Sequence, residues 1–300
     1  MSNPRVALVI SEDHPSFNQD NGALVEALAK LNVEASVHVW TDKSVDWAGF
    51  DLVVLRSTWD YGSRREEFLE WAKSVPNLEN PASVLVWNTD KEYLKTMAEK
   101  GIPTIRTVWL DPARHFSSQA IHTRLPAFGD FVIKPTISAG SQGVARYQEA
   151  TATARTRAIN QVRDMLAAGN HVMIQPYLTS VDHEGETSVV FFNGEYSHSF
   201  LKGAMLSRGT APSEIYVEES LKDGVADETF LDLARKSLSA AREILGIEDE
   251  LLYARVDMLP GEEGLPVLLE IELVEPRLFV RRHPGAVENY ARAIAARLSA

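Results

Sequence analysis

Residues 251–277 read LLYARVDMLPGEEGLPVLLEIELVEPR, and this stretch carries the strongest structural signal in the chain. Apolar residues alternate with charged ones in two runs, at 251–259 and 266–273, which predicts two strands joined by a turn rich in glycine and glutamate. On each strand the alternation turns an apolar face toward a core and leaves the opposite face to charged side chains.

The charged residues of this hairpin are spaced so that they share a face. Residues two apart on a strand point the same way, so Glu270 lies beside Glu272, and Arg255 lies beside Asp257. The register of the hairpin decides which charged residues face each other. If the numbers of two facing residues add up to an odd value near 525, Arg255 stands opposite Glu270 and all four charged groups converge.

Asp257, Glu270 and Glu272 are candidate metal ligands. Three carboxylates on one sheet face repel one another unless a positive charge lies between them. Mg²⁺ or Mn²⁺ prefers carboxylate oxygens and keeps positions for phosphate oxygens, and Arg255 adds a fixed cation for a transferred phosphoryl group. A solvated sheet face with surface salt bridges produces the same pattern, so spacing alone leaves both interpretations open.

A loop of small residues follows Lys134. Residues 131–143 read FVIKPTISAGSQG, in which an apolar strand ends at Lys134 and Pro135. Glycine and serine let backbone N–H groups approach an anion, and a lysine before such a loop can reach phosphates as a point charge. The string matches neither the Walker pattern nor G-x-G-x-x-G, so a hairpin turn with a solvent-facing lysine is the alternative.

Lys91 and the strand before Pro176 add weaker signals. Residues 89–92 read TDKE, a capping box that predicts a helix running to Lys100. A cation in the first helical turn opposes the helix dipole, and a bound anion would relieve that conflict. The strand at 171–175 can present backbone donors and acceptors to a flat base, although a plain turn is the commoner role of such a proline.

The first 88 residues alternate between strand and helix patterns, which indicates a parallel βαβ sheet. Strands are expected there at 5–10, 33–39, 51–55 and 83–87, and helices at 22–31 and 64–75. Beyond the lysine helix, further strands are expected at 104–109, 131–134, 143–147, 171–175, 187–192 and 195–202, and helices at 153–168, 230–245 and 284–298.

Composition excludes several classes of protein. The 300 residues are 45% hydrophobic and 24% charged, which is ordinary for a globular chain and excludes disorder throughout. A formal net charge of −12 argues against non-specific binding of nucleic acid. The chain has no cysteine, which removes disulfides, cysteine–zinc sites and a thiolate nucleophile. We find no signal-peptide pattern and no apolar run near 18 residues, so we expect a cytoplasmic protein without membrane or nucleic-acid partners.

Taken in order, these pieces resemble the ATP-grasp superfamily, and within it the branch of glutathione synthetase and alanine–alanine ligase. The resemblance runs over Lys91 with its helix, Lys134 with its loop, Gln175-Pro176-Tyr177-Leu178, Gly185-Glu186, Arg255-x-Asp257 and Glu270-x-Glu272. It implies an α/β chain with the ATP-grasp fold. The implied parts are an N-terminal parallel α/β lobe (1–88), a linker helix with a small central lid lobe (89–176), and a C-terminal antiparallel-sheet lobe that holds the metal site (177–300).

The resemblance also implies residue roles and the cofactors ATP and Mg²⁺ or Mn²⁺. ATP would be bound by Lys91, Lys134, Ser138, Gly140, Ser141, Gly143, Gln175, Tyr177, Leu178 and Glu186. Two metal ions would be held by Asp257, Glu270 and Glu272. Arg255 and Lys134 would be the catalytic residues, with Arg255 steadying the γ-phosphoryl group and the acyl phosphate.

The chain departs from the family pattern in two places. Glu270-Ile271-Glu272 stands where the family usually has Glu-x-Asn, which keeps oxygen ligands and adds negative charge. Glu275-Pro276-Arg277 replaces a turn of small residues that meets the substrate in the family.

A narrower likeness involves two strings, Arg56-Ser57-Thr58-Trp59-Asp60-Tyr61 and Trp87-Asn88-x-x-Lys91-x-Tyr93-Leu94. They resemble the subgroup that contains the O-ureido-serine cyclo-ligase of cycloserine biosynthesis. Loops at the carboxyl ends of parallel strands bind ligands in open α/β sheets. Arg56, Ser57 and Asp60 are therefore candidates for contacts to the carboxylate and amine of an amino-acid-like substrate. Further candidate substrate contacts, not placed by this rule, are Lys202, Arg255 and Arg277.

The resemblance implies an ATP-dependent ligase. A substrate carboxylate would attack the γ-phosphoryl group, and a nitrogen nucleophile would then displace phosphate from the acyl phosphate. The specific expectation is cyclisation of O-ureido-D-serine to D-cycloserine. An intermolecular ligase for amino acids or peptides, and a regulatory module that binds ATP without turnover, stay open as alternatives. A homodimer is compatible with all three.

Overall fold

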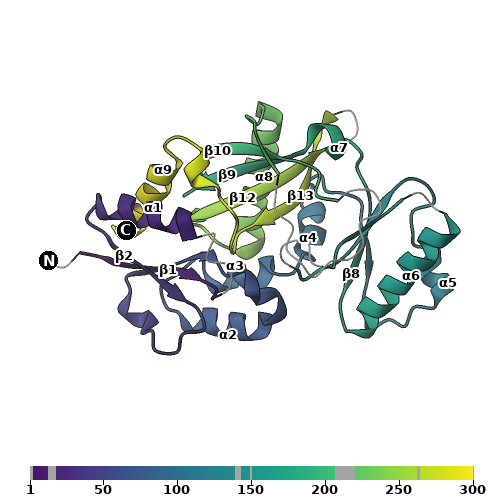
Figure 1. The fold of residues 1–300 in the computed structure, drawn as a ribbon, viewed down its shortest axis with the longest axis horizontal. Coiled ribbons are helices and arrows are strands. Elements are labelled where there is room, and N and C mark those ends of the chain that lie inside the picture. Colours follow the sequence, from purple (N-terminus) through teal and green to yellow (C-terminus); the bar gives the residue numbers. More distant parts are fainter. Residues whose placement is uncertain are drawn as a thin grey trace.

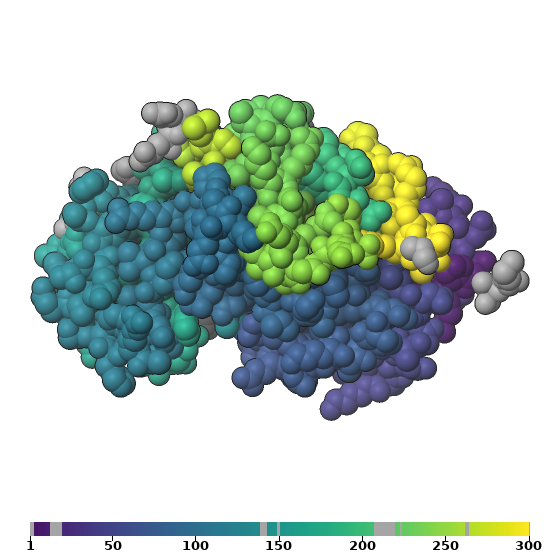
Figure 2. Space-filling view, turned by 180° about the vertical axis from the view of Figure 1, so that it is seen from behind, coloured from purple at the N-terminus to yellow at the C-terminus, as the bar shows by residue number. Residues whose placement is uncertain are grey.

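The computed structural model describes residues 3–12, 18–138, 143–148, 151–206, 220–261 and 264–299, without the side chains of 18, 19 and 223. The chain forms three lobes (Figure 1). The N-terminal lobe lies under the central antiparallel sheet, and the lid lobe with β8 and α6 lies at the far end. Seen from behind, the lid lobe (teal) protrudes at one end, while α9 (yellow) lies beside the purple N-terminal segment at the other (Figure 2).

The N-terminal lobe is a parallel sheet in the order β2-β1-β3-β4. Its strands are β1 (Arg5–Ile10), β2 (Glu34–Val39), β3 (Leu52–Ser57) and β4 (Leu78–Glu79), and its helices are α1 (Asn18–Ala29), α2 (Arg65–Ser74) and α3 (Ala82–Asn88). Every residue of β3 is buried, as expected of a strand inside a parallel sheet. The parallel βαβ prediction is therefore confirmed.

The strand predicted at 83–87 is wrong, because this segment is helix α3. Pro81 occupies the N-cap position in an extended conformation, and Val84 and Leu85 are buried while Val86 is 43% exposed. A short apolar run bounded by a proline suits a strand and a helix equally well, so periodicity cannot separate them. The fourth strand of the sheet is the two-residue β4 instead.

The lid lobe has a sheet in the order β5-β8-β6-β7 and a hydrophobic core of its own. Its elements are β5 (Val108–Leu110), α5 (Ser118–His122), β6 (Phe131–Pro135), β7 (Ala145–Tyr147), α6 (Ala152–Ala167) and β8 (Val172–Pro176). Helix α4 (Tyr93–Glu99) precedes it. The predicted capping box is wrong, because the Thr89 hydroxyl donates to Leu85 O and accepts from Arg65.

The C-terminal lobe is an antiparallel sheet in the order β11-β10-β9-β12-β13. Its elements are α7 (Val181–Glu184), β9 (Glu186–Phe192), β10 (Glu195–Lys202), β11 (Leu221–Asp223), α8 (Glu228–Leu245), β12 (Tyr253–Pro260), β13 (Pro266–Glu272) and α9 (Ala286–Arg297). One-turn 3-10 helices lie at Trp47–Gly49, Trp59–Ser63 and Val280–Arg282. Buried residues of the N-terminal and C-terminal lobes belong to one continuous core, which makes these two lobes a single base for the lid.

The central hairpin has the predicted faces but a different register. Arg255 pairs with Glu272, and Asp257 pairs with Glu270, so the expected pairing of Arg255 with Glu270 is wrong. The register shifts directly after Asp257, where a bulge changes the number of residues on one strand. All four charged groups nevertheless lie on the same side of the sheet and line one cavity.

Among the residues that the structure describes, no helix is long and apolar enough to cross a membrane.

Candidate active site

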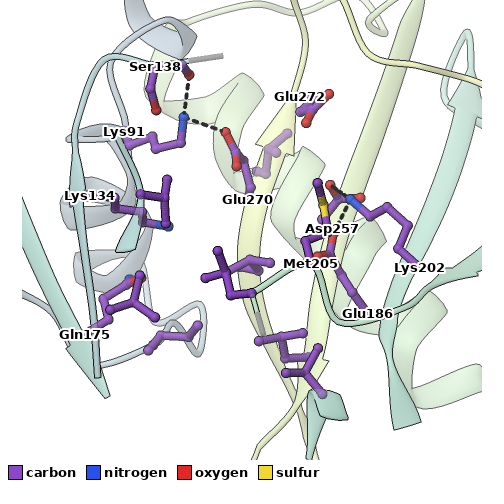
Figure 3. A pocket seen from close by; sticks show the side chains of 18 of the residues that line it. Lys91, Lys134, Ser138, Gln175, Glu186, Lys202, Met205, Asp257, Glu270 and Glu272 are labelled. Atoms are coloured by element: carbon purple, nitrogen blue, oxygen red, sulfur yellow. Dashed lines mark hydrogen bonds and ion pairs between the residues drawn. The ribbon is translucent and has the colours of Figure 1, made fainter. Parts of the chain in front are cut away.

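A cavity of about 270 Å³ lies where the lid lobe faces strands β12 and β13. Lys91, Lys134 and Gln175 stand on one side of it, Glu186, Lys202 and Asp257 stand on the other, and Glu270 lies between them (Figure 3). Trp59, Tyr61 and Asn88 of the N-terminal lobe also line this cavity, so all three lobes contribute to it.

Asp257 is the most heavily hydrogen-bonded carboxylate of the cavity. It is 2% exposed and accepts from Ser188 Oγ at 2.7 Å, from Lys202 Nζ at 2.8 Å and from Arg255 Nη2 at 2.9 Å. Burial favours the neutral acid, but the charges of Arg255 and Lys202 outweigh burial and hold the pKa of Asp257 below its usual range. This carboxylate is therefore ionised and fixed in direction.

Glu270 and Glu272 extend the acidic surface along β13. Glu270 Oε1 lies 3.0 Å from Lys91 Nζ, and Glu272 Oε1 lies 2.5 Å from Arg255 Nη2. Burial raises the pKa of Glu272, and repulsion by Asp257 and Glu270 raises it further against the pull of Arg255. Each of the three acids is thus paired with a cation, and Glu272 is the one whose ionised form is disfavoured.

Two buried lysines approach these acids from the lid side. Lys91 Nζ donates to Ser138 O at 3.0 Å and pairs with Glu270; burial acts to lower its pKa, but Glu270 holds the pKa above the usual lysine value. Lys134, which is 8% exposed, has its pKa lowered to about 8 by burial, with Lys91 adding to the effect and Glu270 opposing it. Both ammonium groups are placed to meet an anion in the cavity.

The other end of the cavity is apolar. Leu178 and Tyr177 pack on a small cluster made of Ile105, Val181 and Leu259. Nearby, Gln175 is 4% exposed and its Nε2 donates to Thr107 Oγ1 at 2.8 Å. Glu186 is ion-paired with Lys202, and burial raises the pKa of Glu186.

Arg146, a residue without a sequence signal, holds this apolar end in place. Its guanidinium carbon lies 3.5 Å from the centroid of the Tyr177 ring and its nitrogens donate to Asp130, Asp182 and Leu206 O. Asp182 also accepts from the Tyr177 hydroxyl at 2.6 Å. Because Asp182 belongs to α7 while Arg146 belongs to β7, the cluster joins the lid lobe to the C-terminal lobe.

The donor set of the cavity fits a hard divalent cation. Asp257, Glu270 and Glu272 offer only carboxylate oxygens, and burial, with repulsion by the other two acids, raises the pKa of Glu272. Among the described residues, however, no three acidic or histidine side chains are already arranged around one point. In this structure the same oxygens pair with Lys91, Lys202 and Arg255.

Most of the predicted site residues line this one cavity. They are Lys91, Lys134, Ser138, Gln175, Tyr177, Leu178, Glu186, Lys202, Arg255, Asp257, Glu270, Glu272 and Arg277. Gly140 and Ser141 lie outside the described residues. Gly143 does not line the cavity; it has a φ of +73° and accepts at its O from Gln161.

Three predicted substrate residues lie away from this cavity. Arg56 and Ser57 line a second cavity, which adjoins the first because Trp59 and Arg277 line both. Asp60 lines neither, and its Oδ1 accepts from Trp40 Nε1 at 2.9 Å.

Tyr61 and Glu275 form a buried pair in the same cavity that sequence reasoning missed. The Tyr61 hydroxyl and the Glu275 carboxyl group influence each other, and burial, with the charge of Glu272, raises the pKa of Glu275 well above its usual value. The two residues are far apart in sequence, so no local pattern could have paired them. Glu275 was noted only as a departure from the family turn.

The whole chain aligns with a known protein of cycloserine biosynthesis. The protein DcsG of Streptomyces lavendulae is 36% identical over 300 residues, with 98% of each chain covered. The chain belongs to the DcsG family. A family model described as the N-terminal domain of the D-cycloserine synthetase DcsG matches residues 6–88.

Solved structures agree with this assignment. The crystal structure of D-cycloserine synthetase DcsG matches with a TM-score of 0.87 and 35% identity, over 98% of this chain and 99% of that one. D-alanine–D-alanine ligase from Bacillus anthracis matches with a TM-score of 0.67 and 15% identity, over 99% of each chain, which shows a shared fold. The ATP-grasp fold predicted from the sequence is thus confirmed, and this DcsG-family protein is an ATP-dependent ligase.

Proposed function

We propose that this DcsG-family ligase closes O-ureido-D-serine to D-cycloserine with ATP. The observation that carries the proposal is the convergence of Arg255, Asp257, Glu270, Lys91 and Lys134 in one cavity, in a chain that aligns over its length with DcsG. This set of groups can neutralise a nucleotide's phosphates and present the terminal one to a substrate carboxylate.

Each residue then has a part in phosphoryl transfer. Asp257, Glu270 and Glu272 would hold Mg²⁺, which offsets charge on the phosphate oxygens. Lys91 and Lys134, which lie on one side of the cavity (Figure 3), would contact the phosphates. The guanidinium of Arg255 is held by Asp257 and by Arg277 O at 2.9 Å, so it is aimed before substrate arrives and stabilises the acyl phosphate and the tetrahedral oxyanion.

The apolar end of the cavity takes the adenine in this proposal. Tyr177 and Leu178 provide the flat walls, Gln175 provides a polar edge, and Glu186 reaches the ribose hydroxyls. Arg146 fixes the Tyr177 ring from behind. Gly140, Ser141 and Gly143 would contribute the loop that covers the phosphates, as in the family to which the sequence order points.

Ring closure needs no nucleophile from the protein. The oxygen-bound nitrogen of the ureido group attacks the acyl phosphate of its own molecule, phosphate leaves, and the carbamoyl group is released by hydrolysis. Holding one substrate in a folded conformation makes this attack an orientation effect. His198 and His283 stack on each other with ring centroids 4.3 Å apart and do not line the cavity, so this proposal assigns no proton transfer to them.

An intermolecular amide ligase is the second candidate, and one observation favours it. The second cavity adjoins the first at Trp59 and Arg277 and has room for another small molecule. A coupling reaction would place its nucleophile there.

Product analysis separates these functions. The protein is incubated with ATP, MgCl₂ and O-ureido-D-serine, and in parallel with pairs of D- and L-amino acids. We expect ADP and D-cycloserine in equal amounts with the single substrate. A dipeptide formed only from two amino acids would establish the intermolecular ligase, and no ADP with any substrate would indicate a binding module.

A further inference from the structure

The second cavity, of about 370 Å³, lies at the carboxyl end of the parallel sheet. Ser57 ends strand β3, and Asn21 belongs to the first turns of α1. The strand order β2-β1-β3-β4 puts β2 and β3 on opposite sides of β1, so the chain switches direction between β1 and β3. Open α/β sheets bind ligands at this kind of switch point.

Arg56 is a buried cation inside this cavity. It is 6% exposed, its Nε donates to Asn21 Oδ1 at 3.1 Å, and its guanidinium carbon lies 5.0 Å from the centroid of the Tyr290 ring. No salt bridge joins it to a carboxylate of the described residues. A buried guanidinium without an opposite charge is unfavourable, and a bound anion would compensate it.

Asn21 supplies a second, independent indication that this cavity binds a ligand. It is 2% exposed and lines the cavity, and its Nδ2 has no hydrogen-bond partner in the structure. Because its Oδ1 already accepts from Arg56, the amide nitrogen is the end left to donate. Buried donors of this kind are normally paired, so an acceptor oxygen is the expected occupant.

The walls of the cavity add positive charge. Arg277, Arg281 and Arg282 line it together with Arg56, and Asp20 is the only acidic residue among its described lining residues. Arg277 and Arg281 also interact with other groups, so Arg56 and Arg282 are the guanidinium groups that favour a negatively charged ligand over a neutral one. This contrasts with the first cavity, whose floor is formed by Asp257, Glu270 and Glu272.

We propose that the second cavity binds a small oxyanion, with Arg56 and Asn21 as its principal donors. A carboxylate of an amino-acid-like molecule and inorganic phosphate share this chemistry. The site is separate from that of the activated carboxylate beside Arg255, and Trp59 and Arg277 form the shared wall. The proposal holds for the nucleotide-free protein and does not depend on which product the enzyme makes.

Binding to the nucleotide-free protein tests the proposal. Sodium acetate, D-serine and sodium phosphate are titrated separately by isothermal titration calorimetry at constant ionic strength. We expect at least one of them to bind, and the Arg56→Met variant to lose about tenfold or more in affinity. Acetate or D-serine binding more tightly than phosphate identifies the carboxylate as the natural ligand, and the reverse identifies phosphate.

Further variants assign the signal to this cavity. Lys134→Met, which alters the first cavity, keeps the affinity, whereas Arg282→Gln at the exposed wall lowers it several-fold even if Arg56→Met does not fold. Arg292→Gln, an exposed arginine on α9 outside the cavity, serves as the matched control and binds as the wild type does. The proposal is overturned if no probe binds, if the folded Arg56→Met and Arg282→Gln variants bind as the wild type does, or if Lys134→Met loses the binding.

Discussion

Lys134 shows what a sequence can indicate about one side chain and what it cannot. The apolar strand that ends at Lys134 and the small residues after it indicated a phosphate contact, and the structure sets its side chain in the cavity. The sequence could not show that Lys91 lies near enough to lower its pKa, because that neighbour is distant in the chain.

Lys134→Ala should lower turnover by about 10²-fold or more, because a buried cation that meets charge developing in phosphoryl transfer is removed. Steady-state ADP release measures this, and circular dichroism checks the fold. Lys95→Ala is the matched control, since Lys95 pairs with Glu92 and lies outside the cavity. Equal rates in both variants would contradict the assignment.

ATP affinity should depend on the charge of Lys134. With a pKa of about 8 in the free protein, Lys134 loses its proton as the pH rises through 8, so ATP should bind about fivefold more weakly at pH 9 than at pH 8. Calorimetric titrations between pH 7 and pH 9.5 measure this. In Lys134→Arg the guanidinium stays charged, so the loss should disappear; an unchanged pH profile in that variant would exclude Lys134 as its source.

At the scale of elements, the alternation of residues in strand β13 predicts which face is charged but not how the strand pairs with β12. Alternation predicted which face of β12 and β13 is charged, and the structure agrees. The register depends on a bulge after Asp257, which arises from packing and leaves no mark in the alternation. The short apolar run at 83–87 fits a strand and a helix equally well, so its pattern could not identify helix α3.

Asn88 at the end of α3 ties this helix to β13. Its Nδ2 donates to Ile271 O at 2.8 Å and its Oδ1 accepts from Leu273 N at 2.8 Å. Asn88→Ala leaves the backbone N–H of Leu273 without this partner, whereas Ile271 O keeps its bond from the Tyr93 hydroxyl, so we expect a loss of about 1–2 kcal/mol in the free energy of unfolding. Urea denaturation measures the loss, with the partly buried Asn289→Ala as control; a change below about 0.5 kcal/mol would show that β13 does not rely on this link.

At the scale of the whole molecule, the lid lobe has its own core, while the other two lobes share one. The order of motifs predicted three lobes. The contacts between them could not be predicted, because Arg146 with Asp182, and Tyr61 with Glu275, join segments that no local pattern relates.

Arg146→Met should therefore raise the KM for ATP about tenfold or more while changing kcat less, because it frees the Tyr177 ring and releases the lid from α7. Arg146→Lys should recover part of the affinity, since it restores the charge without the fork of donors. Arg163→Met, an exposed residue of α6, is the control. A fall in kcat with an unchanged KM would argue against a positioning role.

The central claim is that Asp257, Glu270 and Glu272 coordinate the divalent metal ion that binds together with ATP. A crystal structure with Mn²⁺ and a non-hydrolysable ATP analogue, located by the anomalous signal of manganese, tests it most directly. We predict manganese within about 2.3 Å of oxygens from these three carboxylates, with the γ-phosphate facing Arg255. Manganese and phosphates bound elsewhere, with the carboxylates still paired to Lys91, Lys202 and Arg255, would contradict it.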